Sequence, residues 1–209
     1  MAAVEAAKIE WPSRENGSGS EPSEPTAEPV EINRSECDDE GCQDNGCCSS
    51  QPYAVASFSI RTSQEIHEVA PSELARVVAK IIEIEGPIHR EEIARRVTHL
   101  WGLQRTGRRI RDAVSKAIRV ASHSAGVNRD GDFFSPDGQM EVTVRDRGEV
   151  TCTTLRQPKM LPPVEIRKAV TAIVEVHLGV ERDEAVTEAA RLFGFRSTRS
   201  QLRQIIERE

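Results

Sequence analysis

The residues of this chain that are best suited to chemistry are basic side chains gathered around one predicted helix. Between Gly86 and Arg129 the sequence holds ten basic residues and three acidic ones, a net charge of +7. Such an excess favours binding of nucleic-acid phosphates, because basic side chains displace the counterions condensed on them. The alternative is a solvated helical face with local ion pairs, such as Arg108–Asp112 and Asp112–Lys116 at i, i+4. We expect phosphate binding, because three carboxylates cannot pair all of this charge.

The candidate phosphate contacts lie along this helix and in the hairpin predicted after it. Arginines at a helix N-terminus oppose the helix dipole, which favours anions there. A phosphate would pair with these arginines and would also accept hydrogen bonds from the free backbone N–H groups. The predicted nucleic-acid-binding residues are Arg105, Arg108, Arg109, Arg111, Lys116, Arg119, Arg129, Arg145 and Arg147.

Four cysteines near the N-terminus are the other group with a possible chemistry. Cys37, Cys42, Cys47 and Cys48 have the spacing C-x4-C-x4-C-C, which lacks the short C-x2-C clip typical of zinc sites. Four thiolates can hold zinc or an iron–sulfur cluster. The acidic residues around them are typical of a solvated tail, so we predict reduced thiols in a flexible linker, with no metal and no cofactor.

No constellation of residues in the sequence predicts catalysis. His89 is expected to cap a helix, and His99 and His123 have no acidic or cysteine partner at motif spacing. Pro136-Asp137 begins a pattern similar to a nuclease motif, but the lysine of that motif is missing from the sequence. The sequence also lacks a GxxxxGK[ST] phosphate loop, so the chain is not expected to hydrolyse ATP by itself. We predict a binding module rather than an enzyme.

The elements that position these residues occur twice in the sequence. Residues 73–114 align without a gap on residues 165–206, a shift of 92 positions, and ten of the 42 pairs are identical. Each copy predicts three helices with a tight turn before the third, which is the outline of a helix-turn-helix. The predicted helices are 72–85, 90–101 and 107–121 in the first copy, and in the second a helix around Ile166–Val174, the helix 182–193 and a third capped by Ser197 or Thr198.

A β-hairpin is predicted after the third helix of the first copy. Asp130-Gly131 and residues 136–138 are turn signals, and they flank predicted strands at 132–135 and 140–144. A hairpin in this place is the wing of a winged helix. The expected fold class is mainly α, with tandem helix-turn-helix (winged-helix-like) repeats and a small β-hairpin wing, preceded by a disordered acidic N-terminal segment.

The composition of the chain sets the expected domain boundaries. Residues 1–66 carry four basic and thirteen acidic residues, a net charge of −9, and the remaining residues carry +3. A stretch this poor in large apolar side chains is expected to be disordered. Neither a signal peptide nor a run of about 20 apolar residues is found, so we expect a cytoplasmic protein without a membrane partner. The expected parts are a linker at 1–66, a winged-helix-like unit at 67–147, a connector at 148–163 and a second three-helix unit at 164–209.

Several blocks of the chain resemble one bacterial family. They are residues 85–89 (EGPIH), residues 92–97, Gly102 and residues 105–110 (RTGRRI). The family is a domain of unknown function at the C-terminal end of very large superfamily-one DNA helicase proteins, which also carry an endonuclease domain similar to that of very-short-patch repair. The resemblance spans about residues 72–209. It implies a setting of DNA defence or repair, a helicase–nuclease polypeptide as partner, and no catalytic residue in this domain.

These observations together predict a non-catalytic nucleic-acid-binding accessory module of a DNA helicase/endonuclease system. It would bind DNA, as a duplex and with weak sequence preference. The first alternative is a protein-interaction module that docks the helicase–nuclease partner without direct DNA contact. The second is a stand-alone transcription regulator, which the overall acidity and the lack of a ligand domain disfavour.

Overall fold

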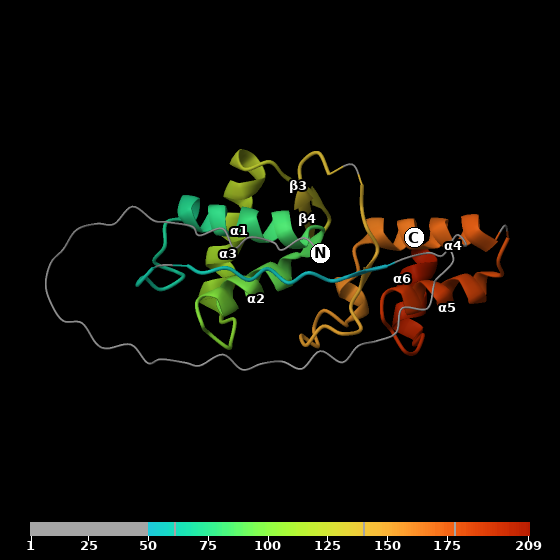
Figure 1. The fold of residues 1–209 in the computed structure, drawn as a ribbon. Helices are drawn as coiled ribbons and strands as arrows, with labels where there is room; N and C mark the ends of the chain where they lie inside the picture. The colour runs from blue at the N-terminus through green and yellow to red at the C-terminus, as the bar shows by residue number, and fades with distance from the viewer. Residues whose placement is uncertain (1–49, 61, 140, 178) are drawn as a thin grey trace, which may run out of the picture.

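A computed structural model of the chain describes residues 50–60, 62–139, 141–177 and 179–209 (Figure 1). Six α-helices and two small sheets make this part of the chain mainly α, as the sequence predicts. The helices form two clusters that lie side by side. The first unit contains α1, α2 and α3 with the strands β2, β3 and β4, and the second unit contains α4, α5 and α6.

The first unit is held together by the apolar stripes of α1 and α3, which pack on each other. Leu74, Val78 and Ile81 of α1 recur at helical spacing and are fully buried, as are Val114 and Ala117 of α3. The three helices begin and end within three residues of the predicted positions. They are α1 (Pro71–Glu85), α2 (Arg90–Leu100) and α3 (Arg108–Ser124).

A three-stranded antiparallel sheet closes one end of the first unit. Its strands are β2 (Ile88–His89), β3 (Val127–Asp130) and β4 (Phe133–Pro136), in the order β2-β4-β3. The predicted hairpin turn is confirmed: Gly131 has φ +60° between β3 and β4. The predicted second strand at 140–144 is wrong, because β4 pairs with 127–130 and residues 141–144 form no strand. The polar sequence of β3 gave little signal, since Val127 is its one buried residue.

The second unit has the same succession of helices. Its members are α4 (Pro163–His177), α5 (Arg182–Leu192) and α6 (Ser200–Arg208). The bounds of α4 and α5 lie 92 positions after those of α1 and α2, and α6 begins 92 positions after α3. The second unit has its own core, in which Phe193 and Leu202 are buried. The predicted cap of its third helix is wrong: Arg199 is the N-cap of α6, and it makes no side-chain cap hydrogen bond.

The glycines that end α2 and α5 have the same local geometry, as expected. Gly102 has φ +70° and Gly194 has φ +79°. The residue after each glycine donates a backbone hydrogen bond to the carbonyl five positions back, at 3.0 Å for Leu103 and 2.9 Å for Phe195. This is the Schellman cap, which favours glycine because the backbone is left-handed there.

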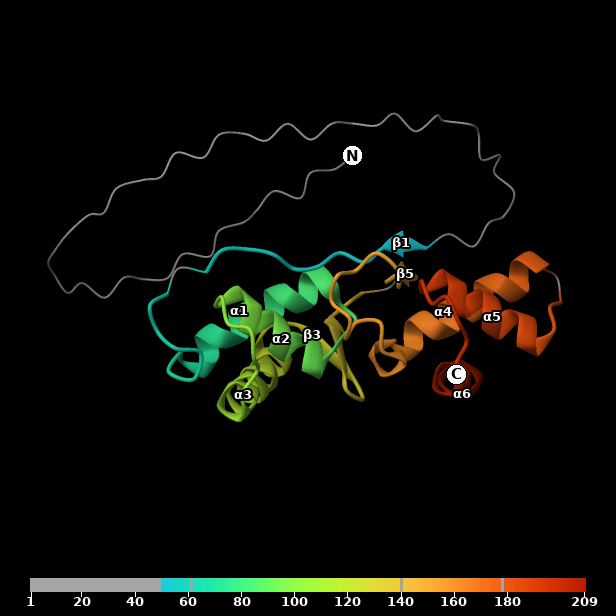
Figure 2. The same cartoon turned by 90° about the horizontal axis from the view of Figure 1, so that it is seen from below.

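The segment before α1 is packed on the folded part, which corrects the expectation of disorder up to residue 66. The strand β1 (Gln51–Pro52) pairs in parallel with β5 (Arg145–Asp146), and Figure 2 shows the two strands between the helical clusters. Tyr53 is buried against the connector, and Ile66 is buried in the core of the first unit. The connector contains one 3-10 turn (Pro158–Met160). The four clustered cysteines lie outside the described residues.

Candidate nucleic-acid interface

The outer face of α3 carries the basic side chains that the sequence singles out. Arg108, Arg109, Arg111, Lys116 and Arg119 are all exposed, while the opposite face of the helix is buried. The N-cap is Gly107, which has no side chain to cap the helix, and the first turn of α3 contains no acidic residue. The N-terminus of α3 thus combines free backbone donors with positive side chains, an arrangement that favours an anion.

A groove runs between α2 and α3. It has a volume of about 420 Å³, and a second hollow of about 250 Å³ lies between α3 and the β3–β4 hairpin. Arg90 and Ser115 line both hollows, so they are adjacent. We call the cationic surface along them the basic groove. Its members are Arg90 and Arg95 of α2, Arg105 of the turn, Arg111 and Arg119 of α3, and Arg129 of the hairpin.

Four of the six arginines of the basic groove have no carboxylate partner among the described residues, whereas Arg90 and Arg95 pair with Asp132 and Glu92. In the described part of the chain, the side chains of Arg105, Arg111 and Arg119 have no ion-pair partner. Arg90 pairs with Asp132 at 3.5 Å, and both side chains are about half exposed. Arg129 Nε donates to the carbonyl of Gly131 (2.8 Å), and no carboxylate of the described residues pairs with it. The groove is therefore a surface on which exposed positive charge is concentrated.

The remaining basic residues of α3 lie on a different side of the helix. Arg109 and Lys116 line a separate hollow of about 390 Å³, together with His67 and Glu68 before α1. Of the two local ion pairs weighed for α3, the described residues form the one between Arg108 and Asp112, which lie 3.9 Å apart with both side chains exposed. The structure thus divides the candidate residues of α3 between two surfaces.

Arg145 and Arg147 do not belong to the interface, which corrects the expectation that they contact nucleic acid. Arg145 Nε donates to Glu165 Oε1 (2.7 Å), and its Nη1 donates to the carbonyl of Glu85 (2.6 Å). Arg147 Nη2 donates to Glu165 Oε2 (2.9 Å), and its side chain is only 1% exposed. Both guanidinium groups also lie over the ring of Tyr53. They join the N-terminal segment and the two units, and they are not free to bind phosphate.

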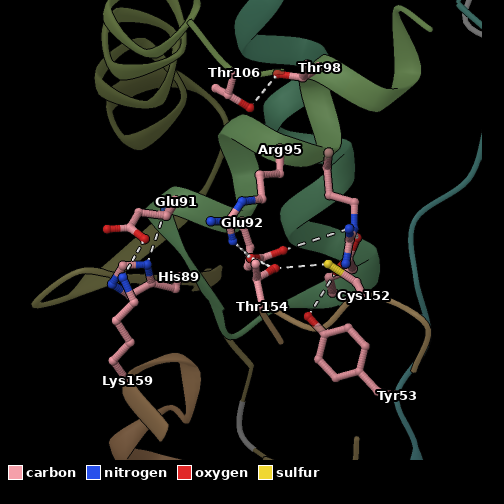
Figure 3. A network of polar contacts seen from close by, with 12 residues as sticks. Tyr53, His89, Glu91, Glu92, Arg95, Thr98, Thr106, Cys152, Thr154 and Lys159 are labelled. Carbon is pink, nitrogen blue, oxygen red and sulfur yellow. Dashed lines mark hydrogen bonds and ion pairs between the residues drawn. The ribbon is translucent and has the colours of Figure 1, made fainter. Parts of the chain in front are cut away.

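A second buried network fixes α1 and α2. Glu85 accepts from the hydroxyl of Tyr53 (2.9 Å), the amide of Ala56 (2.8 Å) and Arg96 Nε (2.5 Å). Figure 3 shows Glu92 of α2 facing Arg95 of the same helix and Thr154 of the connector, whose hydroxyl donates to Glu92 at 2.7 Å. These hydrogen bonds connect α2, which lines the basic groove, to α1, the N-terminal segment and the connector.

Sequence reasoning missed both networks, although one signal was present. Glu85 continues the apolar stripe of α1, since it follows Ile81 by four positions and Ile82 by three. A carboxylate on the buried face of a helix calls for a buried partner. The sequence does not say which of the many arginines provides it.

The protein environment shifts the pKa of three groups near the site. Burial, followed by the charge of Glu85, raises the pKa of the Tyr53 phenol, which therefore stays a neutral donor. Burial opposes the charge of Arg96, but the hydrogen bond and charge of Glu85 prevail and raise its pKa. Burial lowers the pKa of His89, and its neutral Nδ1 accepts from the amide of Glu91 (3.2 Å). The expected helix cap at His89 is thus confirmed.

The described residues contain no group of three or more histidine, cysteine or acidic side chains placed to hold a metal. Within the same ranges, every helix is too short or too polar to cross a lipid bilayer.

Comparison with known proteins finds a family match for one stretch of the chain. Residues 64–112 match a family described as "Protein of unknown function (DUF3320)". This agrees with the expectation of a domain of unknown function. The matched stretch runs from the segment before α1 into α3, and it includes Arg105 and Arg111 but not Arg119 or the hairpin. No curated protein and no solved structure matches the chain.

Proposed function

We propose that this protein is a non-catalytic module that binds duplex nucleic acid through the basic groove of its first unit. The observation that carries this proposal is a set of exposed arginines that have no ion-pair partner in the described part of the chain. They are Arg105 before α3, and Arg111 and Arg119 on α3. The order helix, strand, helix, helix and hairpin supports a winged helix, with α3 as the recognition helix and β3–β4 as the wing.

The dimensions of α3 suit a duplex. A helix with its side chains is about 10–12 Å across, and the major groove of B-DNA is about 12 Å wide. With α3 in the major groove of the duplex, Arg111 and Arg119 would face one phosphate backbone, and Arg129 would reach the same backbone from the hairpin. Arginine-to-phosphate contacts carry no base information, so the binding is expected to depend weakly on sequence.

The second unit supports this assignment by contrast. The matching helix bounds and glycine caps favour a duplicated three-helix unit, but the arginines of its third helix are paired. Arg203, at the position equivalent to Arg111, donates to Asp183 (2.6 Å) and also contacts Glu207 (3.5 Å). We infer that the first unit contacts nucleic acid. The second unit would then dock on the helicase–nuclease polypeptide that the family resemblance implies.

Two double variants of α3 test the proposal. Arg111→Ala with Arg119→Ala removes two charges from the basic groove. Arg109→Ala with Lys116→Ala removes two charges from the other side of the same helix. All four side chains are exposed, so helicity should be unchanged. Fluorescence anisotropy with an unrelated-sequence duplex measures how the logarithm of the binding constant falls with the logarithm of the salt concentration. The first pair should make this slope shallower by about 1.8, at about 0.9 for each phosphate contact.

The control pair should leave this slope nearly unchanged. An equal loss in both double variants would contradict the assignment to the basic groove. Absence of duplex binding by the wild type at low salt would refute the proposed function and favour the alternative, docking on a helicase–nuclease partner without DNA contact.

A further inference from the structure

The N-terminal part of the chain carries a charge opposite to that of the basic groove. Residues 1–49 contain twelve acidic and three basic residues, a net charge of −9. The densest run lies at residues 36–44, where five carboxylates occur without a basic residue. This run is Glu36, Asp38, Asp39, Glu40 and Asp44. Blocks of like charge commonly act as interaction tails, and the fitting partner here is cationic.

The basic groove is a cationic surface on which most arginines lack such a partner within the described residues. Arg105, Arg111 and Arg119 have no ion-pair partner there, although the second unit pairs its equivalent arginine internally. The first unit therefore keeps charge exposed that carboxylates of the same protein could neutralise. Carboxylate and phosphate oxygens accept the same bidentate hydrogen bonds from arginine, so the two ligands compete for one site.

The chain is long enough to bring the acidic run to the groove. The run is joined to β1, which is paired with β5 between the two units. From residue 50 an extended chain spans up to about 50 Å to residue 36 and up to about 20 Å to residue 44, so the carboxylates at residues 36–40 have the longer reach. A compact domain of about 140 residues has a radius of gyration of about 14 Å, so this reach covers either face. Tethering at this length gives an effective concentration in the millimolar range.

We propose that residues 36–44 occupy the basic groove and compete with nucleic-acid phosphates for its arginines. This inference rests on the proposed function and concerns the regulation of that same site. Nucleic acid must then displace the acidic run before it binds. Because salt screens the tail–groove attraction, the competition is strongest at low ionic strength, and it makes the salt dependence of the intact chain shallower.

The test uses the full chain with the five carboxylates of the run replaced by amides: Glu36→Gln, Asp38→Asn, Asp39→Asn, Glu40→Gln and Asp44→Asn. With an effective concentration of about 1–10 mM and a tail–groove dissociation constant of about 1 mM, duplex affinity at low salt should rise about two- to ten-fold. The log–log salt slope should become steeper. The matched control neutralises five exposed carboxylates elsewhere and makes the same change in net charge; these are Glu141, Glu149, Glu175, Glu181 and Glu184.

The outcomes separate the two proposals. A rise in affinity confined to the tail variant supports competition for the groove. An equal rise in both variants shows a general effect of net charge and overturns the inference, as does no rise in either while the wild type binds duplex. If the wild type does not bind duplex at low salt, the proposed function itself fails, because a competition of about two- to ten-fold is too weak to abolish binding.

Discussion

Removal of Glu165 should be among the most damaging single changes to this protein. Its carboxylate is fully buried and accepts hydrogen bonds from both Arg145 and Arg147. Glu165→Ala leaves Arg147, whose side chain is 1% exposed, as a buried charge without its carboxylate. Breaking a buried pair in this way costs about 3–5 kcal/mol of unfolding free energy. Because this is a large share of the 5–15 kcal/mol of a typical domain, the variant should be only marginally stable.

A surface pair gives the matched control. Glu91 Oε2 and Lys159 Nζ lie 2.8 Å apart, but each side chain is 46% exposed. Glu91→Ala makes the same change in net charge and should cost at most about 1 kcal/mol, because exposed pairs contribute little. Urea unfolding followed by circular dichroism at neutral pH measures both values.

Glu165→Gln keeps the volume and one acceptor, so it should fall between the two alanine variants and remain measurable if Glu165→Ala does not fold. If Glu165→Ala costs no more than Glu91→Ala, the buried network does not hold the two units together as argued.

Two further predictions concern glycine and histidine. Gly102→Ala and Gly194→Ala both place a side chain at positive φ, which should cost about 1 kcal/mol of unfolding free energy. An added Cβ has open space at Gly102, but at Gly194 it would lie 2.1 Å from Asp146 Oδ1. Gly194→Ala should therefore lower the midpoint of thermal unfolding more than Gly102→Ala does. Equal midpoints would contradict this expectation. Burial lowers the pKa of His89, so the stability from its neutral cap is complete above the ordinary histidine pKa and is lost as the pH falls through the lowered value. His89→Asn, an uncharged cap, should therefore lose less stability than the wild type between pH 7 and pH 5, and parallel curves would show that His89 does not titrate in this way.

The sequence predicted the helices well, because their signals are local and periodic. The stripe of α1 and the basic face of α3 follow from spacing along a single helix, and the ends of α2 and α5 follow from one glycine each. The 92-residue shift likewise anticipated the matching helix bounds. Each of these features can be read from a short window of residues, without knowledge of the rest of the fold.

The tertiary structure decided which arginines are free. Arg111 and Arg147 look alike in the sequence, yet Arg111 is exposed in the basic groove and Arg147 is buried against Glu165. It also decided that Tyr53 packs on the folded part, beside a glutamate 32 positions away. Pairing between residues distant in sequence leaves no periodic trace, because any carboxylate can neutralise any guanidinium that the fold brings within about 3 Å. The sequence by itself determined the helices and the charge they carry, and only the packing determined which of those charges face solvent.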